Sequence, residues 1–89
     1  MPHLTNSGFT IKPNPAHGFV QLEYDADRAT KVSYTVTNIT GRMCLSGSFN
    51  ALHGRNSEPI DVADLPTGLY FVKLAGEFGV AEQKLVINQ

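Results

Sequence analysis

The chain has 89 residues, of which 42% are hydrophobic and 17% are charged, and its formal net charge is −1. This length supports one small domain that buries roughly 60% of the surface exposed by its unfolded chain, and the composition argues against a disordered chain. The almost neutral charge argues against nucleic acid or an anionic membrane as partner, and no apolar run approaches the ~20 residues of a membrane-spanning helix.

The first third of the chain reads as a linker followed by short strands. Residues 1–8 contain few apolar side chains and are predicted to be a linker, so that the domain spans residues 9–89. A first strand is expected to end at Pro13 and Pro15, because proline donates no hydrogen bond to a β-ladder and restricts the residue before it. Alternating apolar and polar residues then predict strands over 19–24 and 31–37.

The middle third is predicted to contain a hairpin and a crossing. Thr40-Gly41-Arg42 links two apolar runs, and Gly41 can supply a positive φ in a tight turn. Met43 and Leu45 continue the alternation and are expected to point inward, which would place Cys44 on the opposite face. Residues 50–57 include Gly54 and two asparagines and are expected to be a long irregular crossing between two sheets.

The last third predicts three more strands. They are expected around Ile60 and Val62, over 70–74 and over 85–87, with a hairpin turn at 76–79 and residues 80–87 near a sheet edge. Seven short strands separated by turns predict an all-β protein without helices, an antiparallel β-sandwich. The predicted core consists of Ile11, Val20, Leu22, Val32, Tyr34, Val36, Leu45, Ile60, Val62, Tyr70, Val72 and Leu85.

The sequence gives only weak indications of a catalytic or metal-binding site. The three histidines lie far apart in the sequence, unlike the clustered ligands of a zinc site. Glu58, Asp61 and Asp64 are closer together but do not form a calcium-loop pattern, and Asp64 is expected to brace the following turn through its own side chain. Cys44 has no adjacent His or Lys to activate it. We therefore expect no enzyme activity, no cofactor and no metal.

Four segments occur in a recognisable order, and they carry a family resemblance. The order and spacing resemble the type A C-terminal sorting domain of the type IX secretion system of Bacteroidota, over about residues 9–87. The segments are Lys12-Pro13-Asn14-Pro15-Ala16, Asn38-Ile39-Thr40-Gly41-Arg42, Leu65-Pro66-Thr67-Gly68-Leu69-Tyr70-Phe71-Val72-Lys73-Leu74 and Lys84-Leu85-Val86-Ile87. The residues that match the sorting motifs are Pro13, Asn14, Pro15, Gly41, Arg42, Leu65, Pro66, Gly68, Tyr70, Lys73 and Lys84.

The resemblance implies an immunoglobulin-like sandwich that serves as a secretion signal. A cargo domain would precede this one, pass through the periplasm and be bound there by the outer-membrane secretion machinery. A sortase-like peptidase would then remove the domain, leaving the cargo at the cell surface or outside the cell. The chain departs from the family pattern at Lys12 and at Asn88-Gln89. Cleavage would fall within Leu4, Thr5, Asn6, Ser7 and Gly8.

Two expectations accompany this interpretation. The domain is expected to be a monomer, and Gly68 is expected to sit where a side chain is not tolerated, through either φ or close backbone approach. Because fold does not determine function, two alternatives stay open: an adhesive or carbohydrate-binding module attached to a secreted enzyme, and a structural spacer. A carbohydrate platform would need a planar row of exposed rings, for which Phe49, Phe71 and Phe78 are the candidates.

Overall fold

A computed structural model describes residues 9–77 and 79–89 of the chain. The described residues form seven strands and no helix, so the prediction of an all-β fold is confirmed, and no helix there could cross a lipid bilayer. The predicted linker, residues 1–8, lies outside them, as does Phe78. The strands are β1 (Phe9–His17), β2 (Phe19–Ala26), β3 (Thr30–Asn38), β4 (Met43–Ala51), β5 (Gly54–Asp61), β6 (Gly68–Gly76) and β7 (Gly79–Ile87).

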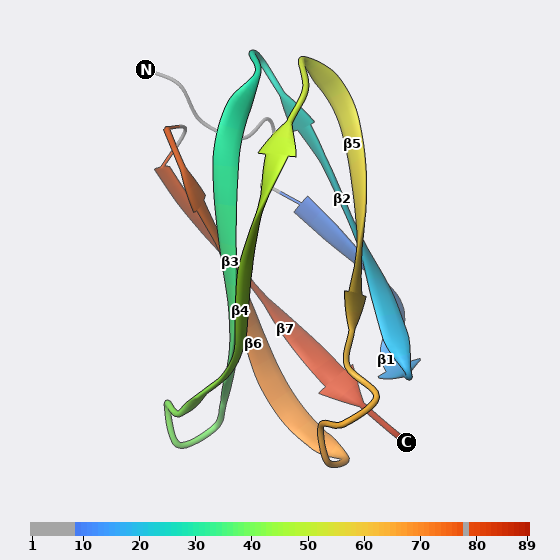
Figure 1. Cartoon of the computed structure of the whole chain (residues 1–89). Coiled ribbons are helices and arrows are strands. Elements are labelled where there is room, and N and C mark those ends of the chain that lie inside the picture. The colour runs from blue at the N-terminus through green and yellow to red at the C-terminus, as the bar shows by residue number, and fades with distance from the viewer. Residues whose placement is uncertain (1–8, 78) are drawn as a thin grey trace.

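The strands form two layers that face each other as a sandwich (Figure 1). Sheet A contains the first part of β1 together with β2 and β5, and sheet B has the order β4-β3-β6-β7. All these neighbouring strands are antiparallel. The last part of β1 joins sheet B instead, where Ala16 pairs with Ile87 of β7 in parallel. Strand β1 therefore links the two sheets.

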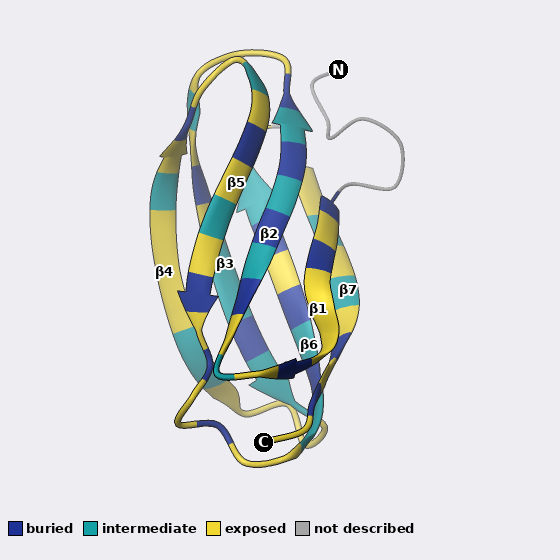
Figure 2. Cartoon of the chain, turned by 90° about the vertical axis from the view of Figure 1, so that its right-hand side faces the viewer, coloured by how far each residue is buried: buried dark blue, intermediate teal, exposed yellow. Residues whose placement is uncertain are grey.

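The core lies between the sheets. It is built from every second residue of the strands, the ones that face inward (Figure 2). Ten of the twelve predicted core residues are buried, whereas Tyr34 and Leu45 are only partly so. Phe49 was not expected to face inward, but it packs against the core and stacks on Tyr34 with ring centroids 5.4 Å apart. A Cβ at Gly47 would lie 2.6 Å from Tyr34 Cε1, so only glycine fits opposite this ring.

The expectation that Pro13 and Pro15 end the first strand is wrong. Strand β1 continues to His17, but its regular pairing with β2 stops after Lys12 and resumes only where His17 meets Phe19. Proline has no N–H for the ladder, so the two prolines interrupt the pairing while the backbone stays extended. The interruption is the point at which β1 leaves sheet A for sheet B.

The predicted orientations of Met43 and Cys44 are also wrong, because a β-bulge shifts the register of β4. Val36 pairs with Leu45, and the next residue of β3, Thr37, pairs with Met43. The extra residue reverses the alternation. As a result Met43 is 57% exposed, whereas Cys44 packs against the core.

The connection between the sheets after β4 is much shorter than predicted. Residues 50–57 do cross from sheet B to sheet A, but only Leu52 and His53 lie outside the strands. The buried Asn56 holds this crossing. Its Nδ2 donates to the carbonyls of Leu52 and Gly54 at 2.9 and 3.0 Å, and its Oδ1 accepts from the Leu52 N–H at 3.0 Å. A side chain thus supplies the hydrogen bonds of a tight turn.

Candidate recognition site

The motif segments gather at one end of the sandwich, which we call the motif end. The β3–β4 turn, the β5–β6 connection and the end of β7 all lie at the lower end in Figure 1. Register ties them together, because Tyr70 pairs with Asn38 and Gly68 pairs with Ile87, which in turn pairs with Ala16. Segments that are up to 71 residues apart in the sequence therefore become neighbours.

Asn14 connects the first motif to the last. Its Nδ2 donates to the carbonyl of Lys84 at 3.1 Å, and its Oδ1 accepts from the N–H of Val86 at 3.0 Å. These are the two bonds that a neighbouring strand would make to β7, and the flanking Pro13 and Pro15 cannot donate them from the backbone. The side chain of Asn14 thus takes the place of a missing stretch of strand.

Tyr70 of β6 closes the loop that precedes this strand and contains Leu65 and Pro66. Leu65 is buried and its N–H donates to the carbonyl of Val62 at 3.1 Å. The hydroxyl of the buried Tyr70 donates to the carbonyl of Pro66 at 2.6 Å, across the bend. Desolvation raises the pKa of Tyr70, and the neighbouring Cys44 acts in the same direction. These motif residues shape the loop and offer little free side chain to a partner.

Gln89, which sequence reasoning noted only as a departure from the family pattern, is a hydrogen-bonding centre of the motif end. Its backbone N–H donates to Thr67 Oγ1 at 3.0 Å, and its Oε1 accepts from the Gly18 N–H at 3.2 Å. No sequence signal pointed to this role. Its Nε2 donates to the carbonyls of Val62, Ala63 and Leu65 at 2.9, 3.3 and 2.9 Å.

The neighbouring Asn88 also ties the end of the chain to the end of β1. Its N–H donates to the carbonyl of Ala16 at 2.8 Å, and its carbonyl accepts from Nδ1 of His17 at 2.7 Å. Residues 88 and 89 therefore close the motif end between the β1–β2 turn and the β5–β6 connection.

The β3–β4 turn has the predicted geometry, and Asn38 organises it. Gly41 has a φ of 88°, which confirms the expected positive φ. The Oδ1 of Asn38 accepts from the N–H groups of Thr40 and Arg42, both at 3.0 Å, and from Thr40 Oγ1 at 2.7 Å. Asn38 and Gly41 are thus structural residues of this motif.

Two turn predictions around Gly68 are corrected. The side chain that accepts a local backbone N–H ahead of the loop is Asp61, which bonds to Ala63 N at 2.9 Å, and not Asp64. Gly68 has no positive φ, and a Cβ there would meet only Tyr70 Cε1 at 3.8 Å, an ordinary contact. A side chain therefore fits at Gly68, and the expectation that it is excluded is wrong.

Three motif residues have no partner for their side chains among the described residues. The charged groups of Arg42, Lys73 and Lys84 take part in no hydrogen bond or ion pair there. Lys73 and Lys84 are exposed on β6 and β7, and Arg42 is exposed in the β3–β4 turn. Their charges are available to a partner.

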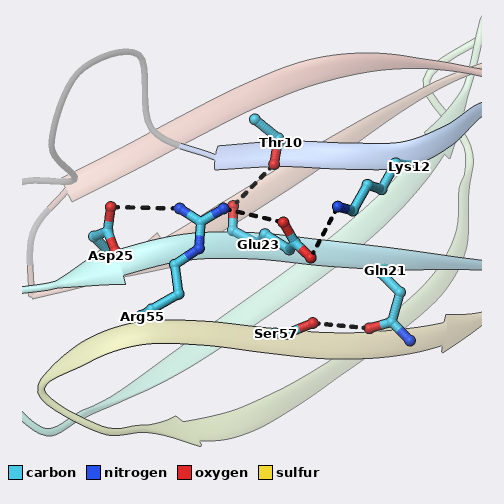
Figure 3. Close-up of polar contacts among 7 residues, drawn as sticks. All are labelled: Thr10, Lys12, Gln21, Glu23, Asp25, Arg55 and Ser57. Atoms are coloured by element: carbon cyan, nitrogen blue, oxygen red, sulfur yellow. Dashed lines mark hydrogen bonds and ion pairs between the residues drawn. The ribbon is translucent and has the colours of Figure 1, made fainter.

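The outer face of sheet A carries a contrasting set of paired charges (Figure 3). Glu23 accepts from Lys12 at 3.3 Å and from Arg55 at 3.0 Å, and Arg55 also reaches Asp25 at 3.5 Å. The hydrogen bond from Lys12 is the largest effect and lowers the pKa of Glu23, desolvation opposes it, and Arg55 acts in the same direction as Lys12. Exposed pairs of this kind stabilise a fold only weakly.

The described residues contain no group of three or more His, Cys, Asp or Glu side chains that could hold a metal ion. The predicted cleavage residues 4–8 lie outside the described part of the chain. The described residues offer a hydrogen-bonded loop assembly with unpaired cations beside it, an arrangement that suits recognition by another molecule.

Comparison with known proteins agrees with this arrangement. A family model described as the secretion system C-terminal sorting domain matches residues 10–88, nearly the whole chain. A search of curated proteins yields no match. The matched range includes each motif segment that meets at the motif end. The chain therefore belongs to the family of C-terminal sorting domains of type IX secretion.

Proposed function

We propose that this domain is the address by which outer-membrane type IX machinery recognises a cargo domain that precedes it. The observation that carries the proposal is the gathering of the motif segments at one end of the sandwich. Phe9, where the described chain begins, pairs with Tyr24 near the opposite end of β2. A cargo joined there would leave the motif end accessible to the machinery.

The remaining steps follow the family role. The precursor reaches the periplasm, the domain folds as a monomer, and the machinery carries the cargo through the outer membrane. A sortase-like peptidase then cuts within residues 4–8, so that the cargo is left at the cell surface or outside the cell. The cut removes the folded domain as one unit.

The outer edge of β7 supports recognition by strand addition. The Lys84 carbonyl and the Val86 N–H face Asn14, so the backbone groups of Val80 and Glu82 point to the same side, away from β6. Among the pairings of the described strands, only Ile87 of β7 meets β1. The outer strands elsewhere are less suited, because β5 contains Pro59 and β4 a bulge. A partner strand can therefore add along residues 79–83, up to the Lys84 carbonyl that Asn14 occupies.

The alternatives receive no support from a specific observation. Phe71 and Phe19 lie on the outer faces of opposite sheets. The partly buried rings of Tyr34 and Phe49 pack against the core. The described residues thus present no planar row of rings for a carbohydrate.

The test is a reporter with a Sec signal, fused ahead of this chain, in a Bacteroidota host with an intact type IX system. We expect the reporter at the cell surface, with a new C-terminus in or near residues 4–8 by mass spectrometry. Removing residues 84–89 should trap the reporter in the periplasm. Surface export in a host that lacks the translocon would contradict the sorting function.

A second variant separates edge recognition from unfolding. Glu82→Pro removes an N–H that points away from β6 and leaves the β6–β7 ladder intact, whereas Glu82→Ala removes the same charge and keeps the N–H. We expect Glu82→Pro to reduce surface export and Glu82→Ala to behave as the unchanged chain. Equal export of both variants would exclude strand addition at this edge.

A further inference from the structure

Although the net charge is only −1, the two sheets carry net charges of opposite sign. The strands of sheet A carry two cations and four carboxylates, whereas those of sheet B carry three lysines and one glutamate. The charged residues of sheet B are Lys31, Lys73, Lys84 and Glu82, and the β3–β4 turn adds Arg42.

The cations also differ in how they are compensated. Lys12 and Arg55 on sheet A form ion pairs of 3.0–3.5 Å, and Arg28 in the β2–β3 turn lies 3.9 Å from Glu77. Across residues 9–77 and 79–89, no carboxylate pairs with a cation of sheet B or of its β3–β4 turn. Sheet B thus presents positive charge that the fold itself does not use.

Two of these lysines, Lys73 and Lys84, flank apolar side chains on the outer face of sheet B. Tyr70, Val72 and Leu85 point into the core, so the residues between them point outward. Phe71 pairs with Lys84, and Leu69 pairs with Val86. Lys73 follows Phe71 on the same face of β6. We call the outward-facing residues Leu69, Phe71, Lys73, Lys84 and Val86 the Phe71 patch. Glu82, which pairs with Lys73, adds one carboxylate to the same face at the border of this patch.

We infer that the Phe71 patch binds an acidic protein surface of the secretion machinery, with carboxylates beside Lys73 and Lys84 and an apolar contact on Phe71. A buried aromatic with cations at its rim is typical of a protein interface. The patch also continues the open edge of β7. A strand added there would place every second side chain on this face, and carboxylates at those positions would lie beside Lys84.

The same cations fit a membrane poorly. Recognition of anionic lipid headgroups uses clusters of about four to eight basic residues, whereas the Phe71 patch holds Lys73 and Lys84 in a chain of net charge −1. The acidic partner is therefore a protein rather than a lipid surface.

The inference rests on the proposed sorting function and is tested in the same reporter host. The variants are the double reversal Lys73→Glu/Lys84→Glu, the milder Lys73→Gln/Lys84→Gln, and Phe71→Ser. Arg28→Glu, in the β2–β3 turn, controls for reversal of an exposed cation, and Phe19→Ser controls for loss of an exposed ring on sheet A. All substituted lysines are exposed, so we expect thermal unfolding of the purified lysine variants to change little.

We expect the double reversal and Phe71→Ser to lower the surface reporter at least about tenfold, the glutamine pair to lower it less, and both controls to match the unchanged chain. Failure of the unchanged chain to reach the surface would contradict the sorting function itself. Export of the unchanged chain together with full export of the double reversal and the glutamine pair would overturn this inference alone.

A second measurement decides between protein and lipid. The purified chain is mixed with phosphatidylcholine vesicles with and without phosphatidylglycerol. We expect no binding to either. Binding to the anionic vesicles that the double reversal abolishes would overturn the protein partner in favour of a lipid surface.

Discussion

Two tyrosines show how residues of the same type serve this fold differently. Tyr24 is 1% exposed, and within the described residues its hydroxyl has no hydrogen-bond partner. Burial raises the pKa of Tyr24 to about 12, with Glu58 acting in the same direction. The hydroxyl of Tyr70, in contrast, donates to the Pro66 carbonyl. The ring of Tyr24 stabilises the core while its hydroxyl does not. In Tyr70, both the ring and the hydroxyl stabilise the fold.

Removing the two hydroxyls should therefore have opposite effects. We expect Tyr24→Phe to leave the free energy of unfolding unchanged or to raise it by up to about 1 kcal/mol, because a buried polar group without a partner is lost. Tyr70→Phe should lower it by about 0.5–1.5 kcal/mol through loss of a hydrogen bond. Urea unfolding of the purified chain measures both. A larger loss for Tyr24→Phe than for Tyr70→Phe would show that the Tyr24 hydroxyl is bonded.

The raised pKa of Tyr24 also predicts how the stability of the fold depends on pH in the alkaline range. Because the pKa of Tyr24 is raised on folding, its neutral form stabilises the fold fully below its ordinary value of 10.0, and this contribution is lost as the pH rises towards about 12. Tyr24→Phe should flatten the fall in stability across this range. An unchanged pH profile would contradict the raised pKa.

At the scale of elements, β1 and β7 explain why the first and last motifs belong together. The two prolines prevent β1 from pairing regularly with either neighbour, and Asn14 supplies the two bonds to β7 instead. Beyond it, Ala16 resumes strand pairing at Ile87. The Pro-Asn-Pro segment is therefore the point at which β1 passes from sheet A to sheet B.

Asn14→Ala should loosen β7 at this point. Each lost hydrogen bond contributes about 0.5–1.5 kcal/mol, so the Val86 amide should exchange with solvent between about twofold and about tenfold faster. Hydrogen exchange followed by NMR measures this change. Asn50→Ala, at an exposed position of β4, is the matched control and should leave Val86 unaffected. Unchanged protection of Val86 in Asn14→Ala would show that the side chain is dispensable.

At the scale of the whole molecule, the two sheets share one apolar core that must supply the stability, because the lone Cys44 is free. Val36 and Val72 lie opposite each other on β3 and β6 and are 1% and 0% exposed. They lie on the two central strands of sheet B, and Val72 lies between Phe71 and Lys73 of the Phe71 patch and points to the opposite face. The recognition surface is thus supported directly by the core.

Replacing Val36 or Val72 with Ala should lower the free energy of unfolding by on the order of 1–3 kcal/mol, through lost burial and a residual cavity. The double variant should deviate from the sum, because the two side chains are neighbours. Val80→Ala, at a position that is 67% exposed, should stay within about 0.5 kcal/mol. Urea unfolding checks all four, and an equal cost at Val80 would contradict the placement of the core.

Local patterns in the sequence determined most of the fold. Alternation along residues 19–24, 31–37 and 70–74 predicted the strands and their buried faces, because burial on one side of a strand repeats every second residue. Gly41 and the turn at 76–79 were predicted from their backbone requirements, and Gly76 does pair with Gly79. The motif segments were also readable, since each is a continuous stretch.

Only the tertiary structure decided which contacts those segments make with one another. The bonds from Asn14 to β7 and from Gln89 to the β5–β6 connection join residues 22 to 72 positions apart, so no local pattern specifies them. The bulge at Cys44 depends on pairing with β3, and the tolerance at Gly68 depends on what surrounds it. The separation of charges between the sheets likewise follows from which strands pair, because neighbours in a sheet need not be neighbours in the chain.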